Sequence, residues 1–450
     1  MSTVADIEDH LSDASNEDDI ALKFAVMYAN RLRYDHTRGK WFHWDGNCWL
    51  LEQTDLAFEW ARTLCRSTRV NNKKEKLASI RVSRAVEQFS RADRRFAVTH
   101  EIWNSDPWLL CTPGGTVDLK TGTIAPNEPS NLITASATVA PTVIETPVWN
   151  KFLTEATNSD DALKLFLQKV AGYCLTGITK EHALFFLYGF GGNGKGTFIN
   201  AIRDIMGDYA INAVMDTFTA SRNDRHPTEL ASLQDARMVT ASETEENRAW
   251  AESRIKQLTG GDPITARFMR QDEFTFMPKF KLVIQGNHAP TLNSVDDAMR
   301  RRFNVIPFVH KPKRVNRDLP DQLKDEYPGI LQWAISGCVA WQKDGLVKPK
   351  AVADETDHYF SEQDVFQQWL DECTEPAGPD IGEPVHRLFD SWKSFCNRMS
   401  EQVGSQKAFS QNMVKARFKR VKELRGSGGK RGFLRISLKV DTSEAYGYVD

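Results

Sequence analysis

Residues 189–197 read GFGGNGKGT and directly follow the apolar run ALFFLY of residues 183–188. This order predicts a buried strand, then a glycine-rich turn, then a helix that begins near Gly194. Glycines let backbone N–H groups face inward around an anion, and the helix N-terminus adds the positive end of its dipole. Lys195 supplies a mobile cation for the β and γ phosphates of a nucleotide. We therefore expect a phosphate-binding loop made of Gly189, Gly191, Gly192, Asn193, Gly194, Lys195, Gly196 and Thr197.

The loop departs from the usual pattern at the position of its magnesium ligand. The spacing fits G-x-x-x-x-G-K, but Gly196 stands where the pattern has Ser or Thr. Thr197 follows one residue later, and one residue turns a helix by roughly 100°, so its hydroxyl cannot simply replace the missing one. Thr197 and Glu243 are the candidate Mg²⁺ ligands. Which hydroxyl or water substitutes for a side chain at position 196 stays open.

Two strands downstream of the loop are predicted to end in polar side chains. Residues 237–246, RMVTASETEE, form an apolar strand that ends in carboxylates. Glu243 and Glu245 point the same way if the strand continues, so either or both could orient an attacking water and hold Mg²⁺. Residues 281–287, KLVIQGN, form a second strand that ends at Asn287. Alone Asn287 would be a turn residue, but in this order it indicates a sensor of the γ phosphate or of the water.

A hairpin is predicted between these two strands. Residues 264–269 and 273–277 can pair around a tip at residues 270–272. Lys256, Arg267 and Arg270 are candidates to hold nucleic-acid phosphates. A solvated hairpin with ordinary surface charge is the alternative.

Three adjacent arginines end a short helix before another apolar strand. They are Arg300, Arg301 and Arg302, within the sequence DDAMRRRFNVIPF of residues 296–308. In a ring of subunits, one of them could reach a neighbouring subunit's γ phosphate, where such a finger is worth roughly 10³ to 10⁵ in rate. A set of intramolecular salt bridges is the alternative.

Composition sets broad limits on the protein class. The chain has 450 residues, 41% of them apolar and 26% charged, with a net charge of −2, which is ordinary for a soluble globular protein. Its seven cysteines show no C-x-x-C spacing, so no zinc or redox motif is expected. No signal peptide and no apolar run of about 20 residues is visible. We expect a soluble, cytoplasmic protein without a membrane partner.

Composition and motif positions divide the chain into successive segments. These are a disordered acidic tail (1–18), an N-terminal α+β domain (19–140), a helical linker or collar (141–180), an ATPase core (181–345), a helical connection (346–379), a basic winged-helix-like domain (380–440) and a tail (441–450). Within the N-terminal domain, residues 20–32 have helical spacing, residues 41–52 alternate like a hairpin, and residues 114–129 read as short strands joined by turns. Its tryptophans could stack on bases, although core packing is favoured.

The end of the chain is basic. Residues 380–440 carry two helical patterns, then a glycine-rich turn, then one alternating strand. Helices that end in a basic hairpin fit a winged-helix module. Its candidates for DNA binding are Lys415, Lys419, Arg420, Lys430 and Arg431, and a solvated helix face is the alternative.

The ordered motifs GFGGNGKGT, VTASETEE, IKQLTGGDPITARF, KLVIQGNHAP and AMRRRFNVIPF resemble those of superfamily 3 helicases. The similarity is greatest to the poxvirus, phage and plasmid primase-helicase branch, and it covers residues 180–310 closely. WDGNCW and GGTVDLKTG, further upstream, resemble the preceding domain of that branch. The resemblance implies an α/β fold with a P-loop AAA+-type NTPase core, ATP with Mg²⁺, and a ring, usually a hexamer. It also implies 3′ to 5′ movement on single-stranded DNA and a hairpin that lines the central pore.

By position in those motifs, Lys195 takes the phosphate role, Glu243 with Glu245 the acidic role, and Asn287 the sensor role. Arg301 or Arg302 takes the finger role. We expect a replicative helicase that acts on single-stranded and forked DNA beside a separate primase or polymerase, since no primase motif precedes the loop. A DNA-binding initiator or loader that uses ATP as a switch is the alternative, and a small-molecule kinase is disfavoured.

Overall fold

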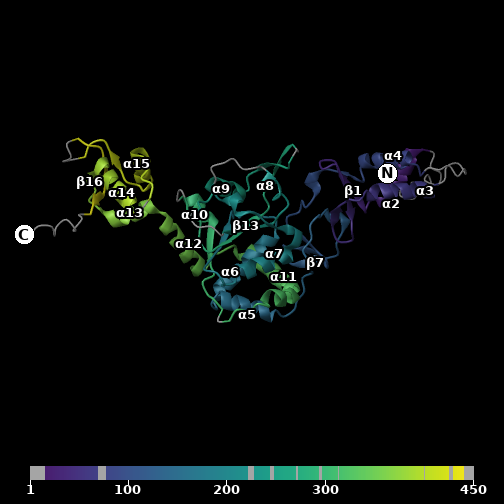
Figure 1. Cartoon of the computed structure of the whole chain (residues 1–450), viewed down its shortest axis with the longest axis horizontal. Helices are drawn as coiled ribbons and strands as arrows, with labels where there is room; N and C mark the ends of the chain where they lie inside the picture. Colours follow the sequence, from purple (N-terminus) through teal and green to yellow (C-terminus); the bar gives the residue numbers. More distant parts are fainter. Residues whose placement is uncertain are drawn as a thin grey trace, which may run out of the picture. The chain divides into compact units, whose positions relative to one another are not determined.

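The computed structural model describes residues 16–68, 78–220, 228–243, 248–269, 272–292, 296–312, 314–399, 401–424 and 429–439 (Figure 1). It divides into two compact units, residues 1–291 with 301–355 and residues 292–300 with 356–450. One boundary lies between residues 291 and 292, and the other two fall inside α10 (Asp297–Arg302) and α12 (Lys350–Gln363). Residues 1–15 and 441–450 of the expected tails lie outside the described residues.

The N-terminal part of the first unit combines three helices with a four-stranded sheet of order β3-β2-β1-β4. Their bounds are α2 (Glu17–Tyr28), α3 (Leu56–Ser67), α4 (Ile80–Ala92), β1 (Leu32–Asp35), β2 (Lys40–Trp44), β3 (Trp49–Leu51) and β4 (Ala97–Val98). The expected disordered tail is wrong at its end, because α2 begins at Glu17, where Asn16 and Asp19 form a capping box. The expected helix to residue 32 is wrong at its end, because Leu32 starts β1 and is buried there.

The predicted hairpin at residues 41–52 is confirmed. Strands β2 and β3 pair antiparallel, with Trp44 opposite Trp49. The turn closes because the Asp45 carboxylate accepts the backbone N–H groups of Asn47 at 2.7 Å and Cys48 at 2.8 Å. Trp41 and Trp49 are buried, as expected for core packing. The predicted short strands at 114–129 are confirmed in a sheet of β5 (Leu109–Thr112), β6 (Gly115–Asp118) and β7 (Thr123–Ala125).

A five-stranded parallel sheet lies at the centre of the first unit, in the order β14-β8-β13-β10-β9 (Figure 1). Its strands are β8 (Leu184–Tyr188), β9 (Ala210–Asn212), β10 (Met238–Glu243), β13 (Lys281–Gly286) and β14 (Phe303–Pro307). Strands β8, β10, β13 and β14 are almost wholly buried, which explains their continuous apolar runs. The chain is therefore a mixed α/β protein with a parallel sheet, as the motifs predicted.

Four helices share one hydrophobic core with this sheet: α5 (Pro147–Ala156), α6 (Asp161–Leu175), α7 (Lys195–Met206) and α11 (Leu319–Asp344). Helices α6 and α11 cross at very short distance. A Cβ on Gly172 would overlap the backbone nitrogen of Cys338, and one on Gly337 would overlap the Gln168 carbonyl. Two glycines thus let the backbones touch, and this contact holds α11 against α6.

The segment between β10 and β13 forms α9 (Glu252–Gly260) and a hairpin of β11 (Ile264–Arg267) and β12 (Glu273–Phe276). The pairing runs from Ile264 opposite Phe276 to Arg267 opposite Glu273, which confirms the predicted hairpin. A short helix, α8 (Thr228–Ala231), precedes β10. Helix α10 leads directly into β14, as predicted for the three arginines.

The second unit has its own core around Trp369, Trp392 and Phe409. Its elements after α12 are α13 (Val365–Cys373), β15 (Thr374–Pro376), β16 (Gly382–Pro384), α14 (Val385–Met399), α15 (Gln406–Lys415), β17 (Arg420–Val421), β18 (Gly432–Leu434) and β19 (Ile436–Leu438). The single alternating strand expected near the end is wrong. Arg435 has a φ of +67°, and this left-handed residue splits the segment between two sheets.

Among the residues that the structure describes, no helix has the length and apolar character needed to cross a bilayer. The seven cysteines are free thiols, and all except Cys373 are buried.

Candidate functional site

The carboxyl edge of the parallel sheet brings the predicted site residues together. The pairing register places Pro307, Tyr188, Gly286 and Glu243 in one row across β14, β8, β13 and β10. The glycine-rich loop leaves β8 one residue past this row, and Asn287 follows β13 by one residue. Open α/β sheets bind their ligands outside the carboxyl ends of the strands. Segments that are far apart in the sequence therefore meet where a ligand is expected.

The glycine-rich loop has the backbone that anion binding requires. Gly192 and Gly194 have φ angles of +83° and +92°, in the left-handed region, and α7 begins at Lys195. Left-handed residues of this kind turn successive N–H groups into one concavity. Gly194 is also fixed by packing, because a Cβ there would stand 2.7 Å from the Phe152 ring. Loop and helix N-terminus together fit the phosphates of a nucleotide.

Lys195 joins the loop to the neighbouring strand. Its ammonium donates to the Gly189 carbonyl, and to the side-chain oxygens of Asn193 and Asn287 at 3.1 Å each. Asn193 in turn donates to the Phe308 carbonyl after β14. Burial lowers the pKa of Lys195 from its ordinary value. The structure thus brings Lys195, Asn193 and Asn287 into one hydrogen-bonded group, which offers a cation to an incoming phosphate.

The residues around the predicted metal position carry hard oxygen donors. Glu243 is buried at the end of β10, and Ser242 and Gln285 are joined by a hydrogen bond of 2.9 Å from Nε2 to Oγ. Gly196 and Thr197 lie in the first turn of α7. No cluster of three or more His, Cys, Asp or Glu residues occurs in the described ranges. A sparse set of oxygens suits Mg²⁺, which keeps several waters and binds largely through substrate phosphates. Glu245 lies outside the described residues.

A groove of about 1000 Å³ is lined by α5 and by residues of the 310–322 segment. Phe152, which packs on Gly194, is part of its lining, together with Lys151, His310 and Arg314. The buried Glu326 of α11 fixes α5 by accepting the backbone N–H groups of Val148 at 2.9 Å and Trp149 at 2.8 Å. No sequence motif signals this groove, because its two walls come from distant parts of the chain.

The three arginines have different surroundings. Arg300 pairs with Asp357 at 3.3 Å and lies over the Phe360 ring. Arg302 donates from Nε to the Thr259 hydroxyl at 3.1 Å. Arg301 is exposed. The two flanking guanidinium groups therefore have partners within the chain, as the salt-bridge alternative allowed for Arg300.

The hairpin presents both charge and apolar surface. Arg267 is exposed at the end of β11, and the next residues, Phe268 and Met269, are 37% and 75% exposed. Phe268 stacks on Phe274 across the hairpin. These apolar tip residues were not among the predicted contacts, although exposed aromatics are frequent partners of bases. Lys256 lies on α9, not on the hairpin, and Arg270 lies outside the described residues.

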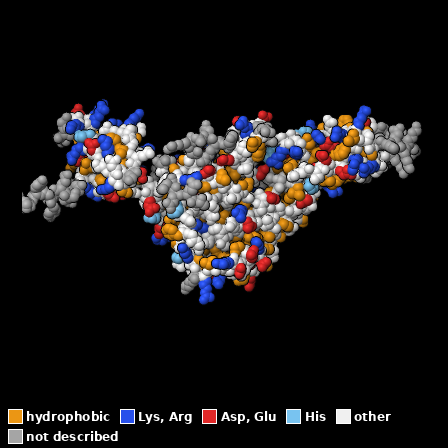
Figure 2. All heavy atoms as spheres, in the orientation of Figure 1, with side chains coloured by type: hydrophobic (Ala, Val, Ile, Leu, Met, Phe, Trp, Pro, Cys, Tyr) orange, Lys and Arg blue, Asp and Glu red, His pale blue; other side chains and the backbone are white. Residues whose placement is uncertain are grey.

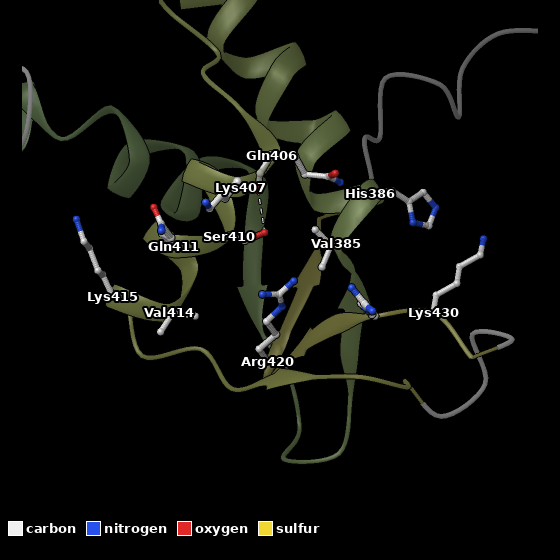
Figure 3. Close-up of a pocket in the computed structure, with 11 residues that line it drawn as sticks. Val385, His386, Gln406, Lys407, Ser410, Gln411, Val414, Lys415, Arg420 and Lys430 are labelled. Carbon is white, nitrogen blue, oxygen red and sulfur yellow. Dashed lines mark hydrogen bonds between the residues drawn. The ribbon is translucent and has the colours of Figure 1, made fainter.

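The second unit contains a basic groove of about 950 Å³ between α15 and the β16–β18 sheet (Figure 3). Of the predicted DNA contacts, Lys415, Arg420, Lys430 and Arg431 line it, whereas Lys419 does not. Figure 3 shows Arg420 rising toward Ser410, with Lys415 and Lys430 at opposite sides. Lys and Arg side chains are also numerous on the face of this unit in Figure 2.

Lys407 and His386, which also line the basic groove, were not among the predicted DNA contacts. Lys407, Gln411 and Lys415 are spaced four residues apart on α15, so they share one helix face. This spacing is a signal that could have identified Lys407. His386 begins α14 and carries no such signal.

Comparison with known families gives two matches. Residues 21–158 match the family described as D5 N terminal like. Residues 187–302, which include the loop, the hairpin and Asn287, match a family of unknown function, DUF5906.

Two viral proteins with helicase names are similar to this chain. One, from Acanthamoeba polyphaga mimivirus, is 28% identical over 233 residues, which is 47% of this chain and 24% of that protein. The other, from Frog virus 3 (isolate Goorha), is 24% identical over 260 residues, 52% of this chain and 27% of that protein. The matched region spans about a quarter of the length of these relatives.

Solved structures of the NrS-1 C-terminal region have a similar fold. One apo structure has a TM-score of 0.56 at 11% identity, covering 92% of this chain and 98% of that one. An A-form apo structure has a TM-score of 0.52 at 12% identity, with the same coverage. At this identity the likeness concerns the fold alone.

Proposed function

We propose that this chain, which is of the phage and viral primase-helicase type that its motifs predicted, is an ATP-dependent replicative DNA helicase. Its core would be a P-loop ATPase of the AAA+ type, and its subunits would form a ring, expected to be a hexamer, around single-stranded DNA. One observation carries the proposal. Lys195 of the glycine-rich loop is hydrogen-bonded to Asn287 at the carboxyl edge of the parallel sheet.

ATP would bind with its phosphates in residues 189–197. Lys195 exchanges its carbonyl acceptors for phosphate oxygens, and the groove beside α5 takes the nucleoside, with Phe152 next to the loop. Mg²⁺, when bound, would neutralise the charge that develops on the phosphates. Thr197 and Glu243 are its candidate ligands. Glu243, with Glu245, orients the attacking water, and Asn287 contacts the γ phosphate.

An arginine from the adjacent subunit would complete the site. Arg300 and Arg302 are held by Asp357 and Thr259 of their own subunit. Arg301, which is exposed, and Arg302, which is half-buried, are the two candidates for the finger that stabilises transition-state charge.

DNA would contact two surfaces. The β11–β12 hairpin lines the pore and moves with hydrolysis, with Arg267, Arg270 and Lys256 on phosphates. The basic groove of the winged-helix-like residues 380–440, with Lys419 beside it, would hold forked or duplex DNA. We propose that a separate primase or polymerase works with this helicase.

A second candidate is a DNA-binding initiator or loader, which binds ATP as a switch without processive unwinding. The observation that favours it is Gly196, because a weaker Mg²⁺ site reduces turnover more than it reduces nucleotide binding. This alternative uses the same surfaces and differs in the rate of hydrolysis.

Steady-state ATPase assays with and without single-stranded DNA test the proposal. We expect DNA to stimulate hydrolysis several-fold, and Lys195→Ala to lower it by on the order of 10²-fold or more. Lys324→Ala, at an exposed position of α11, is the matched control and should retain wild-type activity. ATP binding with negligible turnover would support the switch instead. A protein that stays monomeric and hydrolyses no ATP with any DNA would overturn the helicase, and negative-stain images with an ATP analogue test the ring.

A further inference from the structure

The loop has no hydroxyl at position 196, but an oxygen from another strand stands beside it. A Cβ built on Gly196 would have one neighbour within 4 Å, the Gln285 Oε1 atom at 3.6 Å. This is an ordinary van der Waals distance, so a serine would fit at this position. The amide oxygen of Gln285 therefore faces the space in which the usual loop hydroxyl would lie.

Gln285 is held in this orientation by its neighbour across the sheet. Gln285 of β13 and Ser242 of β10 are register partners, so their side chains leave the same face of the sheet. The Gln285 Nε2 group donates to Ser242 Oγ at 2.9 Å. An amide that donates through nitrogen on one side presents its oxygen on the other, toward Gly196 and the first turn of α7. Gln285 is only half-buried, so solvent and ligand can reach it.

The same alternation separates Gln285 from Glu243. Glu243 is the register partner of Gly286, one residue further along each strand, and its side chain leaves the opposite face of the sheet. Gln285 and Ser242 thus belong to the face of the sheet that α7 covers, whereas the Glu243 carboxylate lies on the other face. Gln285 can therefore face a metal beside α7, while Glu243 faces the part of the site in which the attacking water would lie.

We propose that Gln285 Oε1 is the protein oxygen that ligates the Mg²⁺ of bound nucleotide in place of the missing hydroxyl at position 196, and that Ser242 positions the amide. The inference rests on the proposed nucleotide site and assigns it two further residues. Mg²⁺ accepts amide oxygens and uses few protein ligands beside waters and phosphates. A neutral amide also adds no negative charge next to the phosphates.

The test measures metal binding rather than activity, with Mn²⁺ as the probe. Loss of the free Mn²⁺ electron paramagnetic resonance signal gives its affinity for the protein saturated with ADP. Gln285→Met keeps the side-chain length without an oxygen, and we expect it to weaken Mn²⁺ binding by about 10- to 100-fold. Affinity for ADP in EDTA should stay within about twofold of wild type. Gln285→Glu should bind Mn²⁺ more tightly than wild type.

Rescue provides the decisive comparison. Gly196→Ser should restore most of the Mn²⁺ affinity of Gln285→Met, but should add little to the wild type, where an oxygen already fills the position. Ser242→Ala should weaken Mn²⁺ binding less than Gln285→Met, and should have no effect in the Gln285→Met background. Unchanged Mn²⁺ affinity in Gln285→Met, or an equal gain from Gly196→Ser in both backgrounds, would overturn the inference. Absence of ADP binding in every variant and in the wild type would instead reject the nucleotide site itself.

Discussion

One set of cations in each unit can be compared, and the two sets are held in opposite ways. In the parallel-sheet unit, Lys195, Arg237 and Lys281 are buried, and carbonyl or amide oxygens accept their hydrogen bonds. In the basic groove of the second unit, Lys407, Lys415, Arg420, Lys430 and Arg431 are exposed. Within the described residues, no ion pair involves any of these five.

The difference in burial indicates that the two sets of cations contribute to phosphate binding in different ways. A buried cation has a fixed position and few partners, so its effect depends on geometry and on protonation. An exposed cation keeps its hydration and its full charge, and it acts on a phosphate backbone by releasing counterions. We therefore expect large, non-additive effects from the sheet unit, and small, additive, salt-dependent effects from the basic groove.

Beyond Lys195 itself, the largest effect is expected from Asn287→Ala. The amide is one of the three acceptors of Lys195, and in the proposed mechanism it contacts the γ phosphate. Loss of such a preorganised group should lower kcat for ATP by about 10² to 10³-fold, with little change in KM. Steady-state ATPase assays measure both constants.

A second asparagine ends a strand of the same sheet and offers the control. Asn212 of β9 bonds to the Thr240 hydroxyl at 3.0 Å and has no contact with Lys195 in the described structure. Asn212→Ala should keep wild-type kcat. An equal loss of kcat in both variants would mean that any change at the carboxyl edge of the sheet lowers activity. The contrast between the buried cations of the sheet unit and the exposed cations of the basic groove would then weaken.

An intermediate effect is expected from Lys281 at the start of β13. Burial lowers the pKa of Lys281 to about 7, beside Tyr173, Cys174, Cys338 and Arg237. Because the unfolded chain binds this proton up to an ordinary pKa of 10.5, the folded state gains stability as pH rises above 7. The slope should approach about 1.4 kcal/mol per pH unit for this single group.

Urea unfolding of the wild type and of Lys281→Met at pH 7.0 and 8.5 measures this slope. The wild-type midpoint should rise over this interval more than that of Lys281→Met, while Lys324→Met, changed at an exposed position, should follow the wild type. Higher pH is avoided because burial raises the pKa of Cys174 and Cys338 to about 12, so the folded state loses stability above about pH 9. If the urea midpoint rises equally with pH in the wild type and in Lys281→Met, the Lys281 side chain is not a neutral buried amine.

Local patterns predicted the parts of the site that lie within one segment. The strand, glycine turn and helix around Lys195 are encoded within about 25 residues, and so is the β11–β12 hairpin. The meeting of Lys195 with Asn287 followed from the rule that parallel strands share a carboxyl edge. Periodicity was wrong where burial came from another element, as at Leu32, which keeps helical spacing but is buried as the first residue of β1.

Contacts between distant segments could not be predicted in this way. The Glu326 carboxylate caps α5 from α11, and the groove beside α5 has walls that α5 and the 310–322 segment supply. The Gln285–Ser242 pair requires the register of β13 against β10, which no single strand pattern contains. The left-handed backbone of Arg435 could not be predicted either, because only glycine and asparagine are reliable indicators of a positive φ.

The smallest effects are expected in the basic groove, from Lys407→Ala and Arg420→Ala. If each side chain neutralises one phosphate, each change should lower the slope of log affinity against log salt by about 0.9 for duplex DNA, or by about 0.7 for single strands. Fluorescence anisotropy with labelled DNA at several salt concentrations measures this slope, and ATPase activity without DNA should stay at the wild-type rate. The double variant should lose about the sum of the single slopes, because each cation acts on its own phosphate.

Lys419→Ala sharpens this last prediction. Lys419 lies between groove residues in the sequence but does not line the groove, and its carbonyl accepts the Leu434 N–H. If the groove holds the DNA, Lys419→Ala should change the salt slope less than Arg420→Ala, although both remove one exposed charge. An equal change would mean that DNA responds to the net charge of the unit, not to the groove. The second unit would then differ from the sheet unit in having no defined position for its ligand.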